Sequence, residues 1–173
     1  MANPFSKGWN YLMQSFDTAI DENADPKVQI EQAANAAREQ HRAITQQAAE
    51  IIGQKKQLEI KLGRVREQQA SLQDKTKTAL QMADQATAEG DTAKAQQFNT
   101  TAETLAAQLV ATEQELEGLS TQYGAAERAA AQAEQQQKQS EARLQEQMNE
   151  VNRLRQQVDQ AKMQEHTAQT MDT

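Results

Sequence analysis

The chain has 173 residues, a net charge of −7 at pH 7 and no Cys. Ala and Gln occur 30 times each, whereas Leu, Ile, Val and Phe together occur only 25 times, which is too few for an ordinary globular core. This composition excludes a disulfide framework and a thiolate metal site, and it argues against a compact enzyme. The acidic balance argues against nucleic-acid binding through phosphates. Disordered chain and long helices both fit, and only hydrophobic periodicity separates them.

The first 24 residues are expected to form an amphipathic helix and a linker. Four of the six aromatic residues lie within the first 16 positions, and the large apolar residues recur every three or four positions, as on one face of a helix. This stripe consists of Phe5, Trp9, Leu12, Met13, Phe16 and Ile20. It could insert into a membrane interface, or pack on the chain's own coiled coil or on a neighbour. Membrane insertion is favoured because aromatic side chains suit the headgroup boundary.

A second helix is predicted over residues 26–88. Asp25 suits the N-cap position, and Pro26 suits the first helical position. From Ile30 an apolar residue then recurs every seven positions, eight times in succession, as far as Ala79. The other seam position of the same seven-residue repeat, four residues further on, contains polar residues such as His41. Together the two positions predict a coiled-coil seam in which one position is consistently apolar and the other is partly polar.

A third helix is predicted over residues 92–165, after a break at residues 89–91. Gly90 suits a helix end in the left-handed conformation, and Asp91 suits the next N-cap. A turn this short makes the two helices antiparallel. The predicted fold is therefore all-α: a long antiparallel coiled-coil hairpin over residues 25–165, carrying a short N-terminal amphipathic helix. Residues 166–173 are expected to be a disordered tail.

The large side chains expected in the coiled-coil core share the seam positions of the two helices. They are Ile30, Ile44, Ile51, Leu58, Leu62, Val65, Leu72, Phe98, Leu105, Leu109, Leu116, Leu119, Tyr123, Leu144, Val151, Leu154 and Val158. Folding about Gly90 is also expected to pair basic residues of the first helix with acidic residues of the second. These are Lys61, Arg64 and Arg66, with Glu117, Glu115 and Glu113 respectively.

No catalytic, cofactor-binding or metal-binding residue is predicted. The two histidines, His41 and His166, have no ligand spacing around them. The run from Gly53 to Lys56 lacks the upstream glycine and the following Ser or Thr of a phosphate loop. No window is apolar enough for a transmembrane helix, and the N-terminus lacks the pattern of a secretory signal. We expect neither enzymatic activity nor a small-molecule substrate.

Three segments of the chain resemble the PspA (phage shock protein A) family, which includes the plastid vesicle-inducing protein and belongs to the bacterial branch of the ESCRT-III superfamily. The segments are residues 1–16, the run Asp-Pro-Lys-Val-Gln-Ile-Glu-Gln at 25–32, and the run Ala-Glu-Gly-Asp-Thr-Ala-Lys-Ala at 88–95. The opening Met-Ala-Asn-Pro-Phe, together with residues 44–49, is most similar to actinobacterial members. Compared with the family pattern, the chain resembles a C-terminally shortened form.

The resemblance implies a cytoplasmic, peripheral membrane protein of envelope stress. Such a protein would bind and stabilise damaged inner membrane from its cytoplasmic face and would self-associate through its coiled coil. Membrane lipids and further copies of the chain are the implied partners. An alternative function, also implied by the resemblance, is a coiled-coil regulator that binds and inhibits a stress-response transcriptional activator. Removal of residues 1–20 should abolish membrane binding but leave regulator binding intact.

Overall fold

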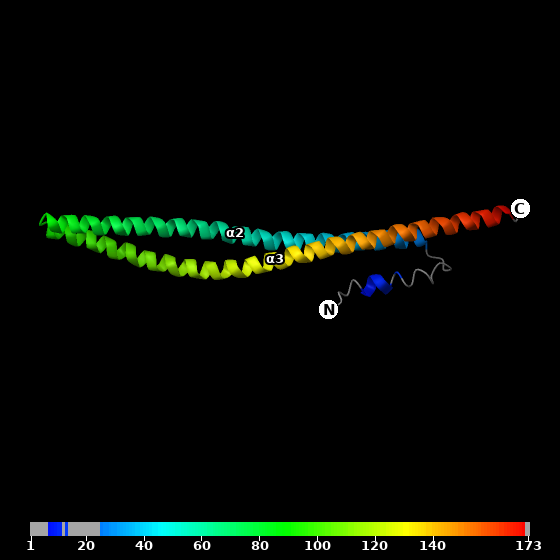
Figure 1. Ribbon diagram of the computed structural model, residues 1–173, viewed down its shortest axis with the longest axis horizontal. Coiled ribbons are helices and arrows are strands. Elements are labelled where there is room, and N and C mark those ends of the chain that lie inside the picture. The colour runs from blue at the N-terminus through cyan, green and yellow to red at the C-terminus, as the bar shows by residue number, and fades with distance from the viewer. Residues whose placement is uncertain (1–6, 12, 14–24, 172–173) are drawn as a thin grey trace. The chain divides into compact units, whose positions relative to one another are not determined.

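The computed structural model describes residues 7–11, 13 and 25–171. Helix α2 spans Pro26–Ala88 and helix α3 spans Thr92–Met171, and they form an all-α helical hairpin (Figure 1). The contacts divide the chain into two units. Unit 1 combines Met1–Gln47 with Glu134–Thr173, and unit 2 is Ala48–Ala133. Each unit pairs one stretch of α2 with one stretch of α3.

The start of α2 is capped by an aspartate. The Oδ1 atom of Asp25 accepts a hydrogen bond from the backbone N–H of Lys27 at 3.1 Å. The Asp25 carbonyl accepts the first helical bond, from the N–H of Val28, at 3.1 Å. Pro26 begins the helix, where its missing N–H leaves no helical hydrogen bond unmade.

The turn between the helices in unit 2 is fixed by two adjacent residues, Gly90 and Asp91. Gly90 has φ of 79°, and its N–H donates to the Thr87 carbonyl at 3.1 Å, while the Asp91 N–H donates to the Ala86 carbonyl at 3.0 Å. This is the Schellman pattern that ends a helix. The Oδ1 atom of Asp91 then caps α3 by accepting the N–H of Lys94 at 3.1 Å. One residue therefore completes the first helix and starts the second.

The core of unit 2 contains a small aliphatic cluster and a run of alanines. Leu62, Val65 and Leu119 are buried against one another. Three half-buried side chains pack around them, Leu58, Leu116 and Tyr123. The remaining buried apolar residues of this unit are alanines, namely Ala48, Ala79, Ala83, Ala86, Ala95, Ala102, Ala130 and Ala133. Among the buried residues of this unit, the large side chains are therefore concentrated near Leu62.

The core of unit 1 is built from both helices and from the N-terminal segment. Its buried residues are Trp9, Ile30, Ala33, Ala34, Ala37, Val151, Leu154 and Val158, with Met13, Leu144 and Met148 packed against them. Ile30 and Val151 are the largest fully buried side chains in the described part of the chain. Unit 1 thus takes large buried side chains from both helices and adds an aromatic residue, Trp9, from outside the hairpin.

None of the seventeen side chains expected in the coiled-coil core is exposed. Seven are buried and ten are half-buried. The half-buried residues are Ile44, Ile51, Leu58, Leu72, Phe98, Leu105, Leu109, Leu116, Tyr123 and Leu144. Partial exposure is expected of a seam between only two helices, because a pair of helices does not by itself enclose the flanks of its seam.

Two sequence-based expectations differ from the structure. Helix α3 continues to Met171, so residues 166–171 are helical rather than disordered; no Gly or Pro follows Gly124 to end the helix. The charge pairs expected in unit 2 are also wrong. Among the described residues of that unit, the only ion pair within 4.0 Å is Lys56–Glu59, inside α2. Exposed charges gain little from pairing, and their hydration opposes it.

Candidate membrane-binding segment

The N-terminal segment is helical over residues 7–11 and at residue 13. Two members of its apolar stripe are described, Trp9 and Met13. The other four, Phe5, Leu12, Phe16 and Ile20, lie outside the described residues. Trp9 is only 6% exposed, and Met13 is half-buried. Both therefore face the hairpin of unit 1 in this conformation.

The indole of Trp9 is held by packing and by one charge-assisted hydrogen bond. The ring belongs to the cluster that contains Ile30 of α2 and Val151 and Leu154 of α3. Its Nε1–H donates to the Oε2 atom of Glu150 at 2.8 Å, in a partly buried position. A bond from a neutral donor to a carboxylate is stronger than one between two neutral groups. The polar edge of the indole is therefore satisfied while its body is out of water.

The other face of this short helix is exposed. Lys7, Gly8, Asn10 and Tyr11 all lie on the surface, and Tyr11 is 75% exposed. Among its described residues, the segment thus has a packed side, with Trp9 and Met13, and a water-facing side. Sequence reasoning did not find Glu150, which lies beside the seam and carries no pattern that marks it as an indole acceptor.

A polar layer crosses the seam of unit 1. His41 Nδ1 lies 2.9 Å from Ser140 Oγ, and Ser140 and Gln147 are buried. The Oε1 atom of Gln40, which is buried, has no hydrogen-bond partner. These residues line a small cavity of about 10 Å³ together with Ala37 and Ile44. The size allows one water molecule at most, so the cavity is too small to hold a ligand.

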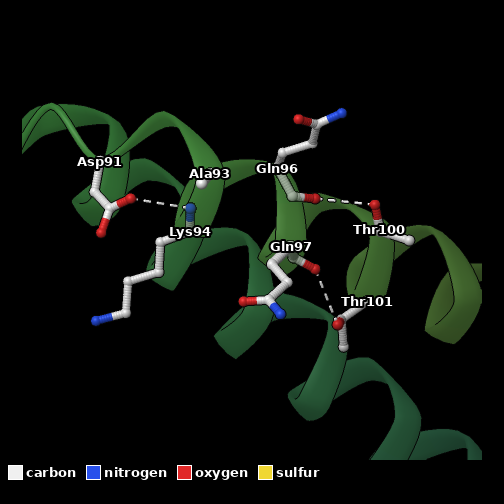
Figure 2. Close-up of a pocket in the computed structure, with 7 residues that line it drawn as sticks. All are labelled: Asp91, Ala93, Lys94, Gln96, Gln97, Thr100 and Thr101. Atoms are coloured by element: carbon white, nitrogen blue, oxygen red, sulfur yellow. Dashed lines mark hydrogen bonds between the residues drawn. The ribbon is translucent and has the colours of Figure 1, made fainter.

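One hollow lies at the start of α3 in unit 2 (Figure 2). It has a volume of about 720 Å³ and is widely open. Its hydrogen bonds are internal to the helix: Thr100 Oγ1 donates to the Gln96 carbonyl at 2.9 Å, and Thr101 Oγ1 donates to the Gln97 carbonyl at 3.1 Å. Lys94 and Asp91 are the charged residues there. No nucleophile is paired with a base, so this surface offers no catalytic arrangement.

A second hollow in unit 2 is mainly apolar. It measures about 470 Å³, and the residues that give it this character are Ala79, Met82, Phe98 and Leu105. Met82 is 45% exposed, and Leu80 on the same helix is 48% exposed. This hollow therefore presents apolar surface on the described part of unit 2.

The described residues contain no group of three or more His, Asp or Glu side chains that could hold a metal ion. Neither α2 nor α3 has a stretch long and apolar enough to span a membrane.

Comparison of the sequence with known proteins identifies the family to which the chain belongs. The model of the PspA/IM30 family matches residues 3–173. The PspA protein of Mycobacterium tuberculosis, from strains ATCC 25618 / H37Rv and ATCC 25177 / H37Ra, is 48% identical over 171 residues, or 99% of this chain. The chain spans 63% of the length of these relatives. No solved structure matches it. From residue 3 to its end, the chain belongs to the PspA/IM30 family.

Proposed function

We propose that the protein is a non-catalytic, peripheral membrane stress protein that binds the inner face of the plasma membrane through its N-terminal helix. The observation that carries this proposal is the apolar stripe of residues 5–20, which concentrates the aromatic residues of an otherwise Ala- and Gln-rich member of the PspA/IM30 family. Damaged membrane exposes packing defects that admit such side chains. The helix inserts into these openings and stabilises the bilayer.

Apolar insertion outweighs charge in this proposal. Each of the six large apolar residues contributes about 1 kcal/mol, because interfacial burial is only partial. Lys7 adds about 1 kcal/mol at an anionic surface, and Asp17, Asp21 and Glu22 oppose it. The helix therefore responds to lipid packing more than to surface charge, and moderate salt should weaken binding only slightly.

Co-sedimentation with vesicles tests the proposal. The full chain should bind small, defect-rich vesicles more tightly than large, well-packed ones, and removal of residues 1–20 should lower binding at least tenfold. Trp9→Glu should have nearly the same effect. Tyr11→Glu is the matched control: it places the same charge on the same helix, at a side chain 75% exposed and outside the stripe. Equal losses in the two variants, or binding that survives the truncation, would refute the insertion mechanism.

The proposal includes self-association through unit 2. The apolar hollow around Met82 and Phe98 supports it, as do two exposed aliphatic residues elsewhere in the unit, Ile60 and Val110, each 54% exposed. Apolar surface of this kind favours contacts between copies of the chain. Sedimentation velocity of Met82→Glu should show smaller species than the unaltered chain. An unchanged distribution would exclude this hollow as the contact.

A further inference from the structure

The Trp9 contact occupies the residue that a membrane would also need. The indole is 6% exposed, and its Nε1–H already donates to Glu150 Oε2 at 2.8 Å. A side chain cannot be buried in the seam of unit 1 and in lipid headgroups at the same time. Docking on the hairpin and insertion into lipid are therefore mutually exclusive states of the same helix.

We propose that the Trp9–Glu150 contact is an autoinhibitory latch that sets the membrane affinity of the N-terminal helix. This inference rests on the function proposed above. In the docked state the Trp9 ring is covered by Ile30, Val151 and Leu154, and Met13 packs against the same cluster. The apparent affinity for membrane is then lowered by the fraction of molecules that are docked. A surface with many packing defects competes with the hairpin for the indole, and an intact one does not.

The two sides of the latch make different contributions. The apolar residues supply burial that lipid can replace, so they do not by themselves favour one state. The carboxylate of Glu150 supplies a charge-assisted acceptor, and the docked indole loses it on release. Glu150 is therefore the residue whose removal should shift the balance most toward the free helix, with the least damage to the hairpin.

Three variants separate the hydrogen bond from charge and from general destabilisation. Glu150→Ala removes the acceptor, whereas Glu150→Gln removes the same charge but keeps an oxygen that can accept the indole N–H. Glu146→Ala removes one charge from an exposed position one turn earlier on α3. Far-UV circular dichroism monitors helicity in all three. Since Trp9 is the only tryptophan, acrylamide quenching of its emission measures docking without lipid.

Binding is measured with small sonicated vesicles of phosphatidylglycerol and phosphatidylethanolamine. Glu150→Ala should bind about three- to tenfold more tightly than the unaltered chain, as expected for loss of a partly exposed bond to a charged group. Its Trp9 should also be more readily quenched before lipid is added. Glu150→Gln should show a smaller change, and Glu146→Ala should match the unaltered chain in both measurements.

Several outcomes would overturn the latch. Trp9 of the unaltered chain could quench as readily as free tryptophan, which would mean that the docked state is not populated. Glu150→Ala could expose Trp9 without tightening vesicle binding. Alternatively, Glu146→Ala could tighten vesicle binding as much as Glu150→Ala does, which would assign the tighter binding to the lost charge. If the unaltered chain binds vesicles in any of these cases, the latch fails and the proposed function survives. If neither the unaltered chain nor Glu150→Ala binds vesicles, both fail.

Discussion

Unit 2 fills its seam mainly with alanines and larger apolar side chains, whereas unit 1 adds an indole, a histidine–serine pair and ion pairs between the helices. In unit 1, Lys27 Nζ lies 3.6 Å from Asp159 Oδ1, and Arg155 pairs with Glu31. No such pair links α2 with α3 among the described residues of unit 2. Polar groups in a seam fix register at some cost in stability. The difference suggests that unit 2 contributes apolar stability, and unit 1 adds register and a regulated contact.

The largest effect should come from the aliphatic cluster of unit 2. Leu62 is 4% exposed, so Leu62→Ala should lower the free energy of unfolding by about 2–4 kcal/mol, through lost burial and the cavity that remains. Leu80→Ala removes the same atoms from the same helix at a residue 48% exposed, and it should cost less than about 1 kcal/mol. Chemical unfolding followed by circular dichroism gives both values. Equal losses would show that bulk near Leu62 does not support the unit.

An intermediate effect should come from the polar layer of unit 1. Ser140→Ala leaves the His41 ring without its partner at 2.9 Å and should cost about 1–2 kcal/mol. Adding His41→Leu should recover most of this loss, because both polar groups are then gone. A double-mutant cycle measured by chemical unfolding gives the coupling energy. Ser71→Ala, at an exposed position, is the control and should change little; additivity of the two seam substitutions would contradict a coupled pair.

The smallest effect should come from Gly53, one of the glycines that α2 and α3 contain within unit 2 and lack within unit 1. A Cβ at Gly53 would meet no atom within 4 Å. Gly53→Ala should therefore raise the free energy of unfolding by about 1 kcal/mol, because alanine has the higher helix propensity. Gly90→Ala is the contrast: at φ of 79° a Cβ is strained, and the variant should lose about 1–2 kcal/mol. Thermal unfolding of the two should shift in opposite directions. A stabilising Gly90→Ala would contradict the turn geometry.

Much of the fold could be predicted because its signals are local and repeated. Apolar residues that recur every seven positions predict a pair of helices. Gly90 and Asp91 together mark the end of the first helix and the start of the second. The burial of Leu62 against Leu119 follows from pairing the helices about that turn. The end of α3 could not be predicted in the same way. Helix ends need a breaker or cap, and a Thr- and Gln-rich segment without Gly or Pro neither stops a helix nor demands one.

The site was predicted only in part, because an apolar stripe does not specify what covers it. Lipid and a coiled coil present similar apolar surface to Trp9, so the sequence supports both docking partners. Choosing between them requires long-range information, such as the hydrogen bond between Trp9 and Glu150, which joins positions 141 residues apart. The expected charge pairs failed for a different reason: exposed charges gain little from pairing, so opposite charges on two facing helices do not by themselves determine partners.

Alanine accounts for 11 of the 19 buried apolar residues in the described part of the chain. An alanine side chain has no rotamers to lose, so its burial carries no side-chain entropy cost. Each one also removes little apolar area from water, so its gain is correspondingly small. The folding free energy of such a seam is therefore the sum of many small, nearly equal contributions from buried alanines along the helices. The few large buried residues, such as Trp9, Ile30 and Leu62, remove more apolar area from water per residue than the alanines do.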